Sequence, residues 1–317
     1  MSSNETEVIE QNNSLIGKFY WNYLIYYFLC IAILPVYILI VACILKSRKH
    51  SAMFQTTFYT ILIQHCIADI LALPFYATLR LSYTLWPHVF YDLKDFGIAA
   101  ISFNGMYWFI IIRCYGITLM TVQRYFIIGR PTDRSTLFMQ SLKPWKVVLI
   151  YWFPPVIFCV IFYSHMDITY DSPEQMKYVT DPDVIEGSSR TAFFYVLFSC
   201  LICLICYGFI LKIVRSKSQT ASVSIQREVR LAFQVLLSFL AKLVMMIYFL
   251  LIFITSLCSA GTIRDMVFVV AVRRNFPTAY GTLSFIGPFT ILIFNNDVYR
   301  NVRRMIFRNK ISKFTVT

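Results

Sequence analysis

The sequence predicts an all-α membrane protein: a seven-transmembrane-helix bundle with a short amphipathic C-terminal helix. Of its 317 residues, 58% are hydrophobic and only 14% are charged, and the mean hydropathy is +0.63. A soluble domain carries about 25% charged residues, so this chain has too little polar surface to cover itself in water. Seven spans of roughly 20 residues use about half of the chain and leave only short loops. No length remains for a soluble catalytic or nucleic-acid-binding domain.

Seven stretches are long and apolar enough to cross a bilayer. They cover Trp21–Leu45, Phe54–Leu79, Phe96–Ile127, Trp145–Ser164, Thr191–Ile213, Leu231–Leu257 and Phe276–Phe294. The apolar stretch Met266–Val272 precedes the seventh span, and we expect an outer loop or helical extension there; an eighth span is the alternative. Pro277 suits the first turn of the seventh helix. The chain thus divides into an extracellular tail (1–20), a seven-helix domain (21–294) and an amphipathic helix with a short cytoplasmic tail (295–317).

The charged residues predict which way the bundle faces. With the N-terminus outside, the inner loops and C-terminal tail hold 19 of the 29 Lys and Arg residues but only three of the 16 acids. This asymmetry follows the positive-inside rule. The net charge of +13 is therefore a topology signal rather than a sign of nucleic-acid binding, and it can also attract anionic lipid headgroups.

The N-terminal tail supports the same orientation. It holds the glycosylation sequons of Asn4 and Asn12, and we predict that both asparagines are glycosylated. The tail is polar and acidic, unlike the basic start of a cleaved signal peptide, so the first span is expected to act as an uncleaved anchor. We expect a multi-pass plasma-membrane protein with an extracellular N-terminus and a cytoplasmic C-terminus.

The cysteines do not indicate a metal site. Eight of the nine lie within the predicted spans, and only Cys258 lies near an outer edge. Cys200, Cys203 and Cys206 share one helical stripe, but no His or acid accompanies them, and buried cysteine usually behaves as a small hydrophobe. We expect no metal and no cofactor. Neither face offers a nucleophile–base pair, so the sequence does not predict an enzyme.

Four local patterns accompany the seven spans. They are Gln123-Arg124-Tyr125 before Arg130-Pro131, Asp69 within Ile67–Pro74, Gly287-Pro288, and the amphipathic segment Asn296–Phe307. The first three resemble the Asp-Arg-Tyr motif, the Leu-Ala-Asp segment and the Asn-Pro kink of rhodopsin-like G-protein-coupled receptors, with Gln in place of the motif Asp. Two features depart from that family: span six has no proline, and the loop His165–Arg190 has no cysteine for the usual disulfide to span three.

This combination resembles the nematode serpentine chemoreceptors of the Srg superfamily, most closely the Srv branch, over the whole chain. The resemblance implies a chemosensory G-protein-coupled receptor, in sensory cilia, that binds a small-molecule ligand and activates a heterotrimeric G protein. It also implies a G-protein-facing switch made of Gln123, Arg124, Tyr125, Glu228 and Pro288, in which Glu228 pairs with Arg124. Two alternatives stay open: Arg124 can simply reach the inner headgroups, and Glu228 can be a solvated loop acid.

A candidate ligand site follows from helical spacing. Stepping outward from Arg113 by three or four residues selects one side of span three. The residues on this side, a neighbour in span three and residues of the facing spans are the candidates for ligand binding. They are Phe103, Met106, Tyr107, Ile110, Phe194, Phe198, Phe249, Phe253 and Tyr280. An apolar pocket with few polar groups suits a small organic ligand. Met106, where amine receptors keep an aspartate, disfavours a biogenic amine, and span seven has no lysine for a retinal Schiff base.

Three charges fall inside the predicted spans: Asp69, Arg113 and Lys242. Arg113 lies about 16 Å outward of Arg124 along span three, at the depth of Asp69. In the related receptors these two positions face each other, and the carboxylate helps to hold a sodium ion. An unpaired charge at this depth costs at least about 2.5–3.5 kcal/mol. We therefore expect an Asp69–Arg113 ion pair in place of the sodium site, joined by Lys242 through water. The alternative is that Arg113 reaches only backbone or water.

Two other kinds of protein compete with the receptor. A ligand-gated cation channel of the odorant-receptor type places its N-terminus inside, against the charge asymmetry. A transporter favours repeated halves and broken helices, and Pro154-Pro155 has no counterpart in another span. The expected partners are a small-molecule ligand, a heterotrimeric G protein and the lipid bilayer, without nucleic acid. The ligand, the G-protein subtype and the oligomeric state stay open.

Overall fold

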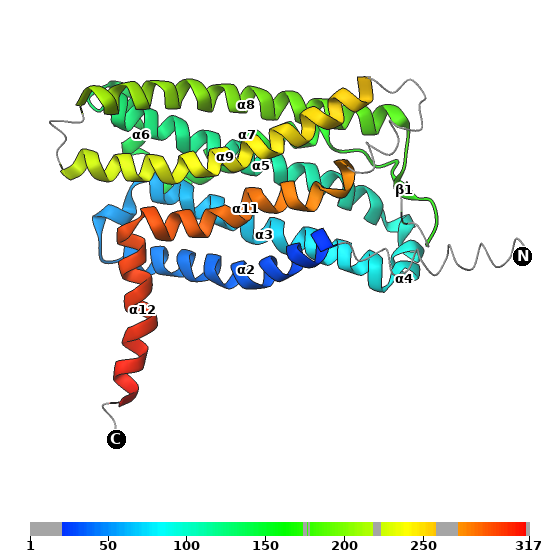
Figure 1. The fold of residues 1–317 in the computed structure, drawn as a ribbon, viewed down its shortest axis with the longest axis horizontal. Coiled ribbons are helices and arrows are strands. Elements are labelled where there is room, and N and C mark those ends of the chain that lie inside the picture. The colour runs from blue at the N-terminus through cyan, green and yellow to red at the C-terminus, as the bar shows by residue number, and fades with distance from the viewer. Residues whose placement is uncertain (1–20, 174–175, 177, 218–222, 258–271, 315–317) are drawn as a thin grey trace, which may run out of the picture.

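The computed structural model describes residues 21–173, 176, 178–217, 223–257 and 272–314. Seven helices in these ranges are long and apolar enough to cross a membrane. They are α2 (Trp21–Arg48), α3 (Thr57–Leu85), α5 (Ile98–Gly129), α7 (Pro144–Phe162), α8 (Pro182–Lys217), α9 (Val223–Leu257) and α11 (Phe276–Phe294). They lie side by side in one bundle (Figure 1). The predicted all-α, seven-helix membrane fold is confirmed.

Several helices extend beyond the apolar spans that marked them. The helix α8 begins at Pro182 instead of Thr191, and α9 begins at Val223 instead of Leu231. Polar residues continue each helix past its apolar stretch, because hydropathy marks only the part that suits a bilayer. The helix α7 runs unbroken through its two internal prolines, which membrane helices tolerate.

Short elements mark the two ends of the bundle. One end, here called the basic end, carries η1 (Ala52–Gln55), α6 (Arg134–Ser141) and α12 (Asn296–Phe314). The other, here called the hairpin end, carries α4 (Pro87–Asp92), η2 (Lys94–Phe96) and the antiparallel strands β1 (Thr169–Tyr170) and β2 (Tyr178–Val179).

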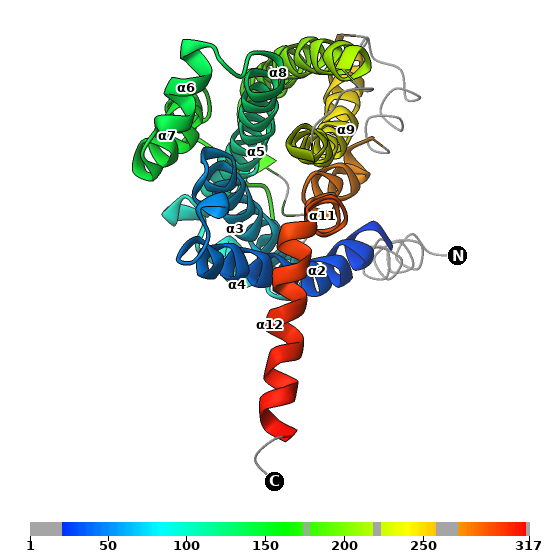
Figure 2. The same ribbon diagram turned by 90° about the vertical axis from the view of Figure 1, so that its left-hand side faces the viewer.

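The helix α12 points away from the bundle across the direction of the spans (Figures 1 and 2). It runs to Phe314, past the predicted end at Phe307. Val298 and Val302 are buried against the bundle, whereas Arg303 and Arg304 are exposed. This first half of α12 is therefore amphipathic, with its apolar side toward the other helices.

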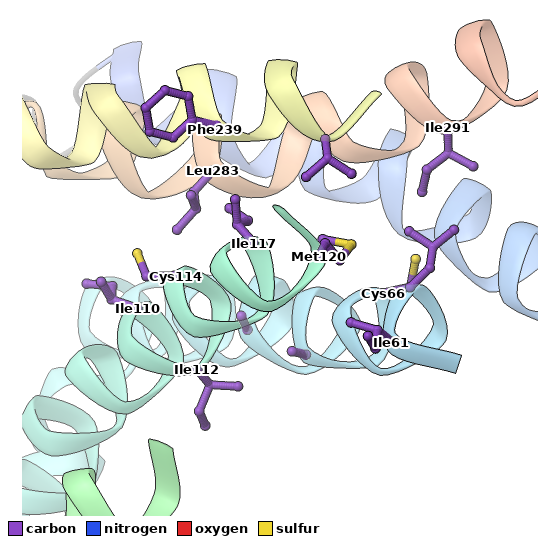
Figure 3. Close-up of a cluster of buried hydrophobic side chains, with 14 of the residues drawn as sticks. Ile61, Cys66, Ile110, Ile112, Cys114, Ile117, Met120, Phe239, Leu283 and Ile291 are labelled. Carbon is purple, nitrogen blue, oxygen red and sulfur yellow. The ribbon is translucent and has the colours of Figure 1, made fainter. Parts of the chain in front are cut away.

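The helix α5 is the centre of the bundle. It packs against α3, α7, α8 and α9, as the view along the bundle shows (Figure 2). Its buried side chains include Ile117, and Leu283 of α11 points toward them (Figure 3). On the outside, large apolar side chains such as Phe28 and Ile31 are exposed by 72% and 75%. An exterior this apolar requires a lipid environment.

Candidate functional site

An ion pair joins α5 to α9 at the basic end. Arg124 Nη1 donates to Glu228 Oε2, and the guanidinium carbon lies 3.5 Å from the centroid of the Phe58 ring. The Arg124 side chain is only 2% exposed, whereas 24% of the Glu228 side chain is exposed. Arg124 therefore faces neighbouring helices instead of reaching outward, and Glu228 is partnered rather than freely solvated.

The other residues assigned to the switch have separate surroundings. Gln123 is buried, and within the described part of the chain its Oε1 has no hydrogen-bond partner. Tyr125 packs against Phe209 of α8, with 5.7 Å between ring centroids. Pro288 is buried within α11, four residues after Ser284. Arg124 and Glu228 are thus in direct contact, and the remaining three make their contacts elsewhere.

A second ion pair at the basic end was not predicted from the sequence. Arg227 Nε lies 3.3 Å from Asp297 Oδ2, which joins the start of α9 to α12. Beside it, the Tyr59 hydroxyl donates to Asn295 Oδ1 at 3.1 Å. The one sequence signal for this pair was Asp297 itself, because it is the one acid in the basic segment after span seven. Two adjacent residues of α9 therefore pair with two different helices.

Asp69 lies at the centre of a polar network in the middle of the bundle. The carboxylate is fully buried and accepts a hydrogen bond from the Ser284 hydroxyl at 2.6 Å. The Tyr37 hydroxyl lies 2.7 Å from both Asp69 Oδ2 and the carbonyl oxygen of Ser284. Pro288 has no N–H to donate to the Ser284 carbonyl, so this carbonyl is free to accept a hydrogen bond from Tyr37. His65 Nε2 lies 3.7 Å from the same carboxylate.

Arg113 belongs to this network. Its Nη1 lies 3.7 Å from Asp69 Oδ1 and donates to the Ser284 hydroxyl, which connects the two charges. The guanidinium also lies 4.1 Å from the centroid of the Tyr280 ring and donates to the carbonyl oxygens of Phe109 and Tyr280. Arg113 therefore lies beside the carboxylate and also donates to backbone carbonyls, so its contacts are not limited to backbone.

Lys242, which was expected to join the Asp69–Arg113 pair through water, makes its direct contacts with other groups. Its Nζ donates to Thr118 Oγ1 at 2.8 Å, to Ser199 Oγ, and to Cys203 Sγ at 3.3 Å. Those groups come from α5 and α8. The side of α9 that carries Lys242 thus faces α5 and α8, whereas Asp69 lies on α3.

Most of the candidate ligand residues lie inside the bundle. Seven are buried or half-buried, namely Phe103, Met106, Tyr107, Ile110, Phe249, Phe253 and Tyr280. Tyr107 is central to them. Its ring stacks on Tyr163 at 4.9 Å and lies 6.4 Å from Phe249 of α9, and its hydroxyl lies 3.1 Å from Ser189 Oγ of α8. This aromatic cluster connects α5 to α8 and α9 on the hairpin side of Arg113.

The prediction for α8 was wrong. Phe194 and Phe198 are 53% and 67% exposed on the outer surface, while Phe193 is 7% exposed and stacks on Phe253 at 4.9 Å. Apolar side chains occur on both sides of α8, because one side faces the bundle and the other can face lipid. Helical spacing alone therefore did not distinguish the buried phenylalanine from its neighbours.

Tyrosine hydroxyls fasten the β1–β2 hairpin to the bundle. The Tyr170 hydroxyl donates to that of Tyr83 at 2.6 Å, and Ser102 Oγ lies 3.1 Å from Tyr170 Oη and 3.2 Å from Tyr178 Oη. Burial raises the pKa of the Tyr170 hydroxyl to about 12, so it stays protonated at neutral pH. These contacts fasten a loop that lacks the cysteine for a disulfide. Apart from the tyrosines themselves, no sequence pattern indicated these contacts.

Three residues from the sequence analysis lie outside the described part of the chain. Asn4, Asn12 and Cys258 fall outside the described ranges. The other eight cysteines are free and buried. Across the described ranges, no three His, Cys, Asp or Glu side chains are grouped as a metal ion would require.

The chain matches one protein family over most of its length. The match covers residues 26–308 and is to the family described as serpentine type 7TM GPCR chemoreceptor Srv. It begins within α2, ends within α12, and includes the Arg124–Glu228 and Arg227–Asp297 pairs. No curated protein matches the chain.

Proposed function

Because the chain belongs to the Srv family of serpentine type 7TM GPCR chemoreceptors, we propose that it binds a small, mostly apolar ligand at its hairpin end and activates a heterotrimeric G protein at its basic end. The multi-pass protein then lies in the plasma membrane, in sensory cilia, with its N-terminus outside and its C-terminus in the cytoplasm. Asn4 and Asn12 carry glycans on the outer side. The family is a class of receptors rather than of enzymes.

The Arg124–Glu228 contact carries this proposal. It holds α5 and α9 together at the end where the basic loops converge. A receptor needs an element with two arrangements that ligand and G protein both bias. Breaking this pair frees the end of α9 and turns Arg124, otherwise buried, toward a docking G-protein α subunit.

The same two helices meet in the aromatic cluster at the other end. Tyr107 of α5 lies against Phe249 of α9, and Phe253 of α9 stacks on Phe193 of α8. A ligand that enters among these rings changes the spacing of α5, α8 and α9. Ligand and G protein thus act on one pair of helices from opposite ends.

Replacing Arg124 with Ala tests the proposal. We expect loss of ligand-evoked nucleotide exchange on the G protein, with normal surface expression, in cells screened against a panel of small apolar odorants. Arg130→Ala, which changes an arginine whose side chain is 61% exposed, is the matched control and should signal normally. Normal exchange in the Arg124 variant removes the switch role from this residue.

A parallel recording separates the receptor from a channel. In cells without G proteins, the odorants should evoke no current. Ligand-evoked current without nucleotide exchange would replace the receptor with a ligand-gated channel. Movement of a labelled ligand across the membrane would instead support a transporter.

A further inference from the structure

The middle of the bundle holds more positive than negative charge. Arg113 and Lys242 are both fully buried, and Asp69 is the one buried carboxylate among the described residues. The remaining buried cation, Arg124, has its own partner at the basic end. His65, beside Asp69, can only add positive charge. One buried cation at membrane depth therefore lacks a counter-ion, which is an expensive arrangement.

Lys242 is the cation without a carboxylate. Its three neighbours, Thr118, Ser199 and Cys203, offer two hydroxyls and a thiol, and none of them is an acid. Within the described ranges no Asp or Glu oxygen lies within 4.0 Å of Nζ, whereas Arg113 has Asp69 at 3.7 Å. Arg113 also retains one buried nitrogen, Nη2, without a hydrogen-bond partner. The Lys242 ammonium thus has hydrogen-bond acceptors in two hydroxyls and a thiol, but no carboxylate balances its charge.

The groups around Lys242 can bind a negative charge. Thr118 Oγ1 and Ser199 Oγ lie 2.7 Å apart, and either can be the donor of that bond. A hydroxyl can rotate from accepting the lysine proton to donating to an anion. Three helices supply the cluster: α5 gives Thr118, α8 gives Ser199 and Cys203, and α9 gives the ammonium. Thr118 Oγ1 already donates to the Cys114 carbonyl oxygen at 2.9 Å, so a small anion there meets the charge of the ammonium and can accept hydrogen bonds from the ammonium and the Ser199 hydroxyl.

We propose that the Lys242 cluster is a binding site for a small monovalent anion between α5, α8 and α9. The anion is chloride from the medium or the carboxylate of a small organic acid, since both offer one negative charge and accept hydrogen bonds. The site stabilises the packing of α9 on α5 and α8. It requires neither the switch nor a G protein, so it stands apart from the proposed function.

The test uses the purified full-length protein in nanodiscs of uncharged lipid. Sodium chloride or sodium acetate replaces sodium gluconate at constant ionic strength, while Tm and the ³⁵Cl NMR linewidth are measured. We expect a saturable rise in Tm of about 2–4 °C at a tenfold excess of the bound anion over its Kd. Saturable broadening of the ³⁵Cl signal identifies chloride. A response to acetate alone identifies a carboxylate, and exchanging sodium for potassium should change nothing.

Variants assign the response to the cluster. Lys242→Met should abolish it, Lys242→Arg should keep it, and Lys212→Met, which alters an exposed lysine of α8, should leave it unchanged. If Lys242→Met does not fold, Ser199→Ala answers the same question through an anion affinity weakened several-fold. An equal wild-type Tm in all three anions, with no saturable broadening of the ³⁵Cl signal in the chloride sample, would overturn the proposal. An unchanged anion affinity in the Lys242 or Ser199 variants would also overturn it.

Discussion

The helix α5 carries two arginine–carboxylate contacts with opposite surroundings. Arg113 and Asp69 are both 0% exposed, and Ser284, the Tyr280 ring and backbone carbonyls complete their contacts. Arg124 meets Glu228 at the edge of the bundle, where the acid is 24% exposed, and Arg124 Nε has no hydrogen-bond partner within the described part of the chain.

The difference shows that surroundings, rather than residue types, decide what such a pair does. Removing one member of a buried pair leaves the other charged and without water, so the mid-bundle pair can hardly open. In the Arg124–Glu228 pair the acid is partly exposed and can exchange its partner for water, so this pair opens at a lower cost than the pair in the middle of the bundle. The first pair therefore suits a fixed part of the architecture, and the second suits a switch.

The largest effect is expected from breaking the Asp69–Arg113 pair in the middle of the bundle. Arg113→Ala leaves Asp69 unpaired in the core, at a cost of about 3–5 kcal/mol. Surface expression, measured by labelling an extracellular tag, should fall to background, as it should for Asp69→Ala. Exchanging the two residues should restore part of the loss, and exposed Arg190, changed to Ala, is the control. Wild-type expression of Arg113→Ala, or additive damage in the exchange, would refute the fixed role of this pair.

A glycine beside the same network should show a smaller effect. A Cβ at Gly287 would lie 2.3 Å from the Tyr37 hydroxyl, which is bound to Asp69. Gly287→Ala should displace that hydroxyl and cost about 1–3 kcal/mol. Thermal unfolding of the purified protein should then occur roughly 2–5 °C lower. Gly208→Ala, where no atom lies within 4 Å of the added Cβ, should not lower Tm, and equal values for the two variants would contradict the close approach.

The Arg124–Glu228 pair should open without unfolding the protein. Glu228→Gln keeps the shape of the side chain but removes its charge, so the arrangement with separated α5 and α9 gains population. A bias of about 1–2 kcal/mol raises ligand-free nucleotide exchange by about 5–30-fold. Surface expression should stay normal, and Glu186→Gln, at the hairpin end, is the control. Unchanged exchange in Glu228→Gln would show that the pair does not restrain α9.

The pair between α9 and α12 should matter least. Arg227 and Asp297 are each about one-third exposed, at 34% and 33%, and such pairs contribute about 0.2–1 kcal/mol. Asp297→Asn should raise ligand-free exchange by at most about fivefold, and added salt should remove the difference. The control is Asp133→Asn, whose partner Arg130 lies in the same loop. An effect as large as that of Glu228→Gln would mean that α12 shares the switch.

The sequence alone determined the number and position of the spans and the depth of the buried charges. Both are local properties, because a bilayer selects apolar stretches of one length and a helix converts residue number into depth. The match in depth between Asp69 and Arg113 was therefore visible before any packing was known. The meeting of Arg124 and Glu228 was expected only through the family resemblance.

Only the tertiary structure decided which side of each helix faces the others. It placed Phe193 rather than Phe194 or Phe198 inside, and it gave Lys242 neighbours on α8 instead of Asp69. In water, a polar stripe marks the outer side of a helix. In lipid both sides are apolar, so this mark is missing and the facing side follows from packing among all seven helices.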